Sequence, residues 1–321
     1  MLIESGTGRS LSPTPDAPVT VSAMATVAVA HFSNRLADSV ERKRSPLVVG
    51  LDPVLELLPD EFRDEAPEEA LVRFCCGIVD AAAPFAAAVK PQSAFFEAHG
   101  SAGVRAFEEV CAYARAAGLL VIADAKRGDI GSTARAYAAA FVEPRGDSPP
   151  LADAVTVNPY LGRDALEPFL AASRRDGAGI FCLVKTSNPG SADVQDLELA
   201  DGRPLWKHVA SLVAELGEEL VGERGLSSVG AVVGATFPHE VAGVRKLLPR
   251  APLLLPGIGA QGGSPAELEA ALAGGPGSAL VSASRSVIYA YRTAGGDWRA
   301  AAATEAERLA REAWSVSGER R

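Results

Sequence analysis

The stretch LLVIADAKRGDIGSTARAYA, residues 119–138, passes from an apolar run through a charged turn into a helix-like segment. Its first five residues are all apolar, as in a parallel strand that is covered on both faces. Asp124, Lys126, Arg127 and Asp129 then bring four charges within six positions. A buried strand that ends in a cluster of charges and leads into a helix is the repeating unit of α/β folds, which gather polar groups at strand ends.

The same unit recurs along the chain. Apolar runs predict strands at 46–52, 86–91, 119–126, 154–160, 179–187, 228–235, 252–259 and 278–285. Helix-length segments lie between them, including 102–118, 129–142, 162–175, 204–222, 264–273 and 296–314. Eight strand–helix repeats predict an α/β protein with a single (β/α)8 TIM barrel. A doubly wound open sheet is the alternative, and the lack of a GxGxxG after the first strand disfavours it.

The composition is that of a globular protein: 321 residues, of which 48% are hydrophobic and 22% charged. A net charge of −9 argues against non-specific binding to nucleic acid or to an anionic membrane surface. The four cysteines lack CxxC spacing, so we expect free thiols in a reducing, cytoplasmic compartment. No run of about 18 apolar residues is present, and no transmembrane helix is expected.

The N-terminal segment differs from the rest. Residues 1–23 are rich in Ser, Thr, Pro and Gly and lack the basic start and apolar run of a signal peptide. We therefore expect a disordered N-terminal extension at 1–23 and a barrel domain at 24–321, with an amphipathic helix that begins near Asn34.

Polar side chains recur at one position in the repeat, at or just past the carboxyl end of a predicted strand. These residues are Asp52, Lys90, Asp124, Lys126, Asn158, Ser187 and Arg285. TIM-barrel enzymes build their active sites on this rim. The pattern therefore predicts an active site at the carboxyl end of the barrel.

The charges of the opening stretch suggest its chemistry. Side chains alternate along a strand, so Asp124 and Lys126 point to the same side. A lysine flanked by carboxylates stays protonated, which suits a proton donor, or a cation that stabilises a carbanion, better than a Schiff-base nucleophile. Asp129 is expected to open the next helix, on one face with Thr133, where a simple helix cap is the alternative role.

A phosphate site is predicted after the seventh and eighth strands, the common position for one in this fold. The segment PGIGAQGG, residues 256–263, has closely spaced glycines that let backbone N–H groups approach an anion. Gln261 adds a neutral donor, and Arg285 can bind two phosphate oxygens at once.

Metal and triad chemistry find no support in the sequence. His31, His99, His208 and His239 are scattered without ligand spacing, and no Ser-His-Asp order is evident. Lys185 could form a Schiff base in principle, but the other motifs disfavour this. We expect neither a metal nor a cofactor.

The segment DAKRGDIGST, residues 124–133, resembles the D-x-K-x-x-D-I…T motif of the orotidine 5′-monophosphate decarboxylase family. Further segments resemble that family in the expected order: GLDP (50–53), VKPQ (89–92), KTSNPG (185–190), PGIGAQGG (256–263) and SASRSVIYA (282–290). The resemblance covers about residues 30–292 and is closest in wording to the longer bacterial branch. Related barrel enzymes share the first motif alone, whereas the whole set is specific.

The resemblance implies decarboxylation of orotidine 5′-monophosphate to uridine 5′-monophosphate, the last step of de novo UMP biosynthesis, without cofactor or metal. It places Lys126 as proton donor in a charged array with Lys90, Asp124 and Asp129. It assigns substrate contacts to Asp52 (ribose hydroxyls), Ser187 (pyrimidine ring), Thr133, Asn158, Pro256, Gln261 and Arg285. A loop-stabilising role for Asn158 stays equally open.

The resemblance also implies a homodimer in which Asp129 and Thr133 reach into the neighbouring subunit's site. Two other functions remain as alternatives. A magnesium-dependent sugar-phosphate decarboxylase or aldolase on the same barrel is disfavoured because GLDP has no second acidic residue beside Asp52. A non-catalytic nucleotide-binding barrel is disfavoured by the intact charged array.

Overall fold

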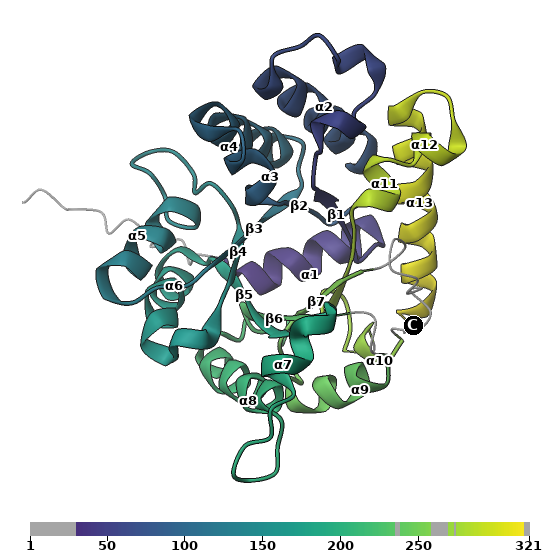
Figure 1. Ribbon diagram of the computed structural model, residues 1–321. Helices are drawn as coiled ribbons and strands as arrows, with labels where there is room; N and C mark the ends of the chain where they lie inside the picture. Colours follow the sequence, from purple (N-terminus) through teal and green to yellow (C-terminus); the bar gives the residue numbers. More distant parts are fainter. Residues whose placement is uncertain (1–29, 235–237, 258–268, 273, 318–321) are drawn as a thin grey trace, which may run out of the picture.

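The computed structural model describes residues 30–234, 238–257, 269–272 and 274–317. The predicted extension at 1–23 and Gln261 lie outside the described residues. Eight parallel strands pair in sequential order and close into a barrel because β1 also pairs with β8 (Figure 1). The strands are β1 Leu47–Leu51, β2 Ala88–Pro91, β3 Leu120–Arg127, β4 Ala154–Val157, β5 Gly179–Lys185, β6 Val229–Val233, β7 Leu253–Pro256 and β8 Ala279–Ala283. The predicted TIM barrel is confirmed, and the open sheet is excluded.

Helices surround the barrel and connect its strands (Figure 1). They are α1 Phe32–Lys43, α2 Pro67–Ala82, α3 Ser93–Glu97, α4 Gly100–Ala116, α5 Gly131–Phe141, α6 Arg163–Asp176, α7 Ala192–Gln195, α8 Leu205–Gly217, α9 Pro238–Leu247, α10 Glu269–Leu272, α11 Arg285–Ile288, α12 Tyr291–Ala294 and α13 Trp298–Val316. Of the helices in the described ranges, none has both the length and the apolar character needed to span a membrane.

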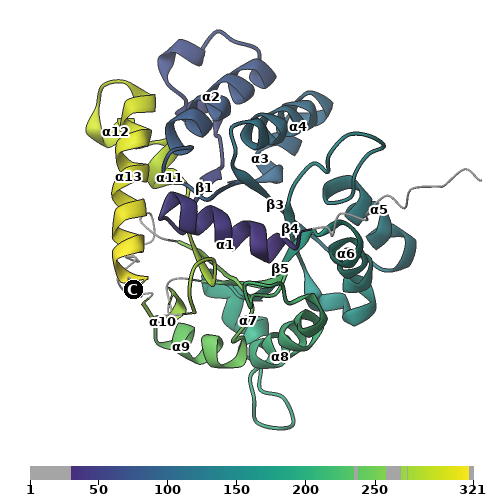
Figure 2. The same cartoon turned by 180° about the vertical axis from the view of Figure 1, so that it is seen from behind.

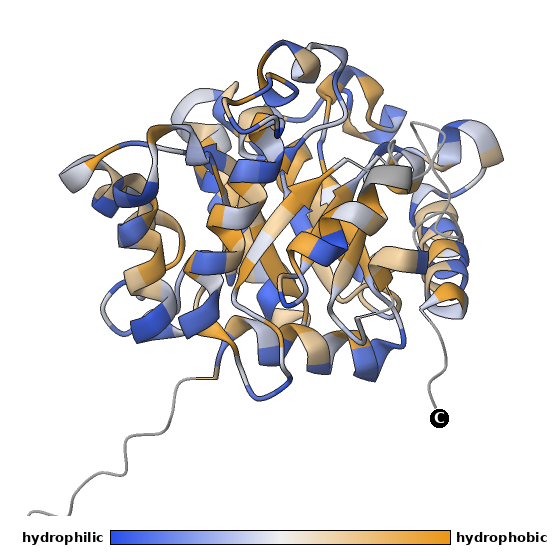
Figure 3. Ribbon diagram, turned by 90° about the horizontal axis from the view of Figure 1, so that it is seen from below, coloured by the Kyte–Doolittle hydropathy of each residue, from blue (hydrophilic) through white to orange (hydrophobic). Residues whose placement is uncertain are grey.

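Two apolar layers hold the barrel together, because successive strand residues face opposite sides. One set, including Val48, Ile122, Phe181 and Leu280, fills the barrel interior. The neighbouring strand residues, such as Val49, pack outward against the helices. Figure 3 shows hydrophobic strands at the centre and hydrophilic residues on the outer surfaces of the helices. Burial of both strand faces explains why the strands read as continuous apolar runs.

Helix α1 lies across one end of the barrel, as the front and back views show (Figures 1 and 2). Phe32, Leu36 and Val40 are fully or almost fully buried in the interior cluster. The Phe32 ring packs edge-on against Phe181, with 5.9 Å between ring centroids. Gly179 makes room for it, because a Cβ there would lie 2.3 Å from a ring atom of Phe32.

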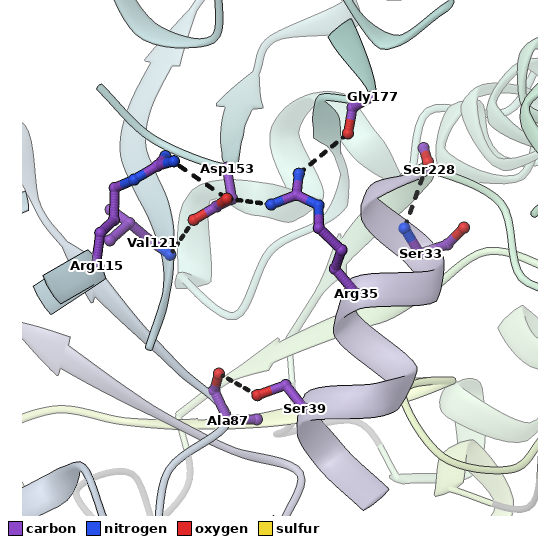
Figure 4. Close-up of polar contacts among 9 residues, drawn as sticks. All are labelled: Ser33, Arg35, Ser39, Ala87, Arg115, Val121, Asp153, Gly177 and Ser228. Carbon is purple, nitrogen blue, oxygen red and sulfur yellow. Dashed lines mark hydrogen bonds and ion pairs between the residues drawn. The ribbon is translucent and has the colours of Figure 1, made fainter. Parts of the chain in front are cut away.

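Polar contacts fix α1 to the segments that precede the strands (Figure 4). The Arg35 guanidinium pairs with buried Asp153, which also accepts a hydrogen bond from the Val121 N–H at 2.9 Å. The Ser39 hydroxyl donates to the Ala87 carbonyl at 3.0 Å. Since α1 closes the amino end of the barrel, the carboxyl end is the one left for a site.

Candidate active site

The site centres on the carboxylate of Asp124, which faces the mouth of the barrel. Ile122 lies in the interior cluster, and alternation places Asp124 on the same side. The Lys90 ammonium, from neighbouring β2, donates to Asp124 Oδ2 at 2.6 Å. Both side chains are only 8% exposed. Strand pairing thus joins two charges that are 34 positions apart in the sequence.

Lys126 occupies the other oxygen of the same carboxylate. Its Nζ donates to Asp124 Oδ1 at 2.5 Å, so these two residues share a side of the strand as the alternation predicts. The Lys126 side chain is 44% exposed, unlike that of Lys90. Lys90 is therefore buried beside the carboxylate, whereas Lys126 is partly exposed to solvent.

The two lysines determine the charge state of Asp124. Burial opposes its ionisation, but the positive charges of Lys90 and Lys126 outweigh burial and lower the pKa of Asp124 to about 2. Burial likewise opposes the charged form of Lys90, yet Asp124 and Asp52 raise the pKa of Lys90 above its usual value. Asp124 is thus an anion and Lys90 a cation at neutral pH.

A bulge in β3 shapes the turn that carries Lys126. Ala123 pairs with Val155 and Arg127 with Val157, so four steps on β3 match two steps on β4. Lys126 has a left-handed φ of 47°, which is uncommon for a residue other than glycine. Bulges of this kind redirect side chains next to active sites.

Thr156 on β4 lies opposite the bulge, between the two β4 residues that pair with β3 on either side of it. The sequence analysis did not predict it as a site residue. Its hydroxyl oxygen accepts the Lys126 N–H at 2.9 Å and donates to Asp124 Oδ1 at 3.0 Å. The signal was present, because Thr156 lies two residues before Asn158 and so faces the same side of the strand. Thr156 lies within β4, whereas the predicted site residues lie at or just past strand ends.

Asp52 follows β1 and lies close enough to Lys90 to raise its pKa. Its Oδ1 is buried and has no hydrogen-bond partner among the residues that the structure describes. Tyr289, also missed in the sequence, holds this loop: its hydroxyl donates to the Asp52 carbonyl at 3.2 Å and accepts the Val54 N–H at 2.7 Å.

Asp129 and Thr133 form no hydrogen bond or ion pair with the charged array in the described ranges. The prediction that Asp129 opens the helix is wrong, since α5 begins at Gly131 and Ile130 occupies the N-cap position. The carboxylate of Asp129 instead accepts the Ile130 N–H at 2.7 Å. The reason is that β3 continues through the bulge to Arg127, which delays the helix. Within the described ranges, no hydrogen bond or ion pair joins Asp129 to Lys90, Asp124 or Lys126, and Thr133 is exposed.

Ser187 follows β5 in a segment that is held at both ends. The Gln195 side chain binds the Thr186 N–H and hydroxyl, each at 2.8 Å. Lys185 Nζ donates to Asp196 Oδ1 at 2.6 Å from a side chain that is 2% exposed. This ion pair engages the Lys185 amine and further disfavours a Schiff base there.

Asn158 has a local structural contact. It caps the short 3-10 helix Pro159–Leu161, and its Oδ1 accepts the Tyr160 N–H at 3.0 Å. The side chain is exposed. This contact fits the loop-stabilising role that the sequence left open, and a substrate contact for Asn158 stays a prediction.

The predicted phosphate region lies at the ends of β7 and β8. Pro256 ends β7 beside Ser282, and Gly257 follows with a φ of 108°. Arg285 is exposed and begins α11 directly after β8. The hydroxyls of Ser284 and Ser286 beside it are buried and have no hydrogen-bond partner in the described part of the chain, so they are further candidate donors.

No group of three or more His, Cys, Asp or Glu residues that could hold a metal occurs among the described residues.

Comparison with known proteins gives one family. A family profile described as "Orotidine 5′-phosphate decarboxylase / HUMPS family" matches residues 45–296. Orotidine 5′-phosphate decarboxylase of Rhodopirellula baltica is 47% identical, covering 81% of this chain and 89% of that protein. The enzyme of Roseiflexus castenholzii is also 47% identical, covering 87% and 96%. The structure of Leishmania donovani OMP decarboxylase superposes with a TM-score of 0.69 at 34% identity, covering 89% of this chain and 98% of that one.

Proposed function

The chain belongs to the orotidine 5′-phosphate decarboxylase / HUMPS family as a carboxy-lyase of UMP biosynthesis, and we propose that Lys126 is its proton donor and that it needs no cofactor or metal. The reaction removes CO2 from orotidine 5′-monophosphate and gives uridine 5′-monophosphate. The observation that carries the mechanism is the Asp124 carboxylate held between Lys90 and Lys126 at the carboxyl end of the barrel.

Asp124 acts on the substrate before the bond breaks. Its pKa of about 2 keeps it ionised, so the substrate carboxylate meets a fixed negative charge beside it. This repulsion is relieved as neutral CO2 forms, which favours the transition state over the bound substrate. Lys90 stabilises the Asp124 anion from below, where it is too buried to serve the substrate.

Lys126 acts as the bond breaks. The bond between ring carbon 6 and the carboxyl group breaks, and its electron pair stays on carbon 6. The Lys126 ammonium stabilises this charge and donates a proton to carbon 6. Its partial exposure lets it reach a ligand and regain a proton from solvent.

The remaining residues bind the parts of the nucleotide that do not react. Asp52 accepts hydrogen bonds from the ribose hydroxyls through its free oxygen. Ser187 contacts the pyrimidine ring, and Asn158 is a further substrate contact. The phosphate binds through Gln261 and Arg285, with Pro256 at the end of β7 beside it. Phosphate binding organises the site and so lowers the barrier at a bond far from it.

A homodimer with shared sites completes the proposal. Asp129 and Thr133 form no hydrogen bond or ion pair with the array within the described part of one subunit, and on the proposed model they serve a partner's site. Large apolar side chains are exposed in segments that follow β3, β4 and β5: Ile130, Tyr160, Leu161, Val194 and Leu197. A second copy that covered them would remove this apolar surface from water.

Loss of orotidine 5′-monophosphate, followed by ultraviolet absorbance, tests the function. Wild-type protein should consume it and should remain active after exhaustive treatment with EDTA. Lys126→Ala should lower kcat at least a hundredfold, a barrier increase of about 2.7 kcal/mol, because the donor and the cation are lost together.

Lys246→Ala, on the exposed surface of α9, is the matched control and should behave as wild type. Activity of Lys126→Ala within tenfold of wild type would exclude Lys126 as the donor. Activity that EDTA stops and magnesium restores would favour the metal-dependent alternative.

A further inference from the structure

We propose that Thr156 is a positioning residue of the decarboxylation, holding Lys126 and Asp124 in their reactive arrangement through one hydroxyl group. This inference rests on the proposed function. Thr156 acts through its two partners, Lys126 and Asp124, and not by direct contact with the reacting atoms.

The backbone at Lys126 lacks a regular partner on β4. The β3 bulge takes Asp124, Ala125 and Lys126 out of register with β4. An N–H group in such a segment loses its ladder partner and must find another. The Thr156 hydroxyl oxygen supplies that partner for Lys126 at 2.9 Å.

The backbone conformation of Lys126 is also strained. A left-handed φ is unfavourable for a residue with a Cβ, and Lys126 has a φ of 47°. Such a conformation persists only where surrounding contacts determine it. If the Thr156 contact were lost, relaxation toward ordinary backbone geometry would turn the Lys126 side chain away from its present direction.

The Thr156 hydroxyl makes two hydrogen bonds, one as an acceptor and one as a donor. A threonine hydroxyl has one hydrogen to donate and two lone pairs to accept, so both contacts can exist at once. It donates to Asp124 Oδ1, the same oxygen that binds Lys126 Nζ at 2.5 Å. These bonds form a closed ring: Thr156 holds the main chain of Lys126, Asp124 holds its ammonium, and Thr156 holds Asp124. Thr156 is 1% exposed, which protects the ring from competing water.

The consequence is kinetic. Proton transfer depends on small displacements of the donor, whereas ribose and phosphate contacts lie on other strands. Loss of the hydroxyl should therefore lower kcat and leave KM nearly unchanged. A residue with only a structural role would instead lower the fraction of folded protein, with normal kcat for the folded fraction.

The test compares Thr156→Val, which keeps the shape and removes the hydroxyl, with Thr156→Ser, which keeps the hydroxyl. We expect kcat of Thr156→Val to fall 10- to 100-fold with KM within threefold of wild type, and kcat of Thr156→Ser to stay within threefold. Hydrogen exchange of the peptide that contains Lys126 should speed up in Thr156→Val and not in Thr156→Ser. Thr304→Val, on the exposed face of α13, is the matched control and should change nothing.

Circular dichroism and titration of active sites normalise each rate to folded protein. If Thr156→Val fails to fold, Thr156→Ala against Thr156→Ser repeats the comparison, again with the hydroxyl as the difference. Wild-type kcat in the variant without the hydroxyl, or an equal loss in Thr156→Ser, overturns the inference. Inactive wild-type protein would overturn the proposed function instead, so the two failures are distinguishable.

Discussion

At the scale of single residues, Asp124 is the side chain on which the site depends. Each of its oxygens binds a different lysine, and one oxygen also accepts the Thr156 hydroxyl. Truncating either lysine removes one of the two charges that compensate this buried carboxylate, which is more costly than losing one surface ion pair. The same residues therefore affect both chemistry and stability.

The charge on Asp124 predicts a pH dependence of stability. Its pKa is about 2 in the folded protein and near 3.8 in an unfolded chain, so it stabilises the fold above about pH 4. This contribution is lost as the pH falls toward 2 and amounts to about 2 kcal/mol. Lys90 behaves oppositely: its raised pKa stabilises the fold below the usual lysine pKa, and this is lost at higher pH.

Denaturant unfolding of wild type and Asp124→Asn between pH 7 and pH 2 measures this effect. The free energy gap between them should shrink by about 2 kcal/mol below pH 4, as wild-type Asp124 takes up its proton. Glu223→Gln, an exposed substitution, should show a gap near zero throughout. A gap for Asp124→Asn that is constant with pH would contradict the assigned charge state.

At the scale of elements, α1 contributes to stability, whereas β3 contributes to the active site. Helix α1 fills the amino end of the barrel with apolar side chains, and its polar residues bind segments before β2, β4, β5 and β6. Strand β3 breaks its regular pairing at the carboxyl end to present Lys126. Stability and chemistry are thereby placed at opposite ends of the barrel.

Phe32→Ala tests whether α1 affects stability without affecting activity. Removal of a fully buried ring should lower the free energy of unfolding by about 3–5 kcal/mol, because a cavity remains between α1 and β5. Turnover per folded molecule should be unchanged, since the site is at the other end. Chemical denaturation and the ultraviolet assay measure the two quantities.

Val104→Ala, on the exposed face of α4, is the comparison variant and should cost less than about 0.5 kcal/mol. An equally small cost for Phe32→Ala would show that α1 is not part of the cooperative core. A large fall in kcat would show that α1 influences the site.

At the scale of the whole molecule, the proposal requires two subunits. Lys126→Ala and Asp129→Ala should each be inactive alone if each site takes Lys126 from one chain and Asp129 from the other. Random exchange between the two mutants makes about half of the dimers hybrid, and each hybrid holds one intact site. Activity of the mixture should therefore recover to about a quarter of wild type.

Mass spectrometry of the mixture confirms that exchange has occurred, and wild type mixed with itself sets the scale. If exchange is complete and no activity returns, Asp129 and Lys126 serve the same chain's site. Recovery in the absence of hybrid dimers would point to contamination by wild-type protein.

The sequence by itself determined the barrel and most of the rim. Eight apolar runs predicted eight strands, each within a few residues, because burial of both faces leaves a signal in the local order of residues. Strand alternation also predicted Asp124 and Lys126 on one side, and the hydrogen bond between them agrees, although the bulge and the left-handed φ at Lys126 set its final direction. The family followed from motifs in their order along the chain.

Only the tertiary structure decided which residues meet. The contacts of Asp124 with Lys90 and Thr156 depend on the register between β2, β3 and β4, and the bulge that delayed α5 beyond Asp129 exists only in that pairing. The pairing of Arg35 with Asp153 depends in turn on how α1 packs against the closed barrel. Periodicity is a property of neighbouring residues, whereas register, bulges and buried polar pairs are settled by the packing of segments far apart in the chain.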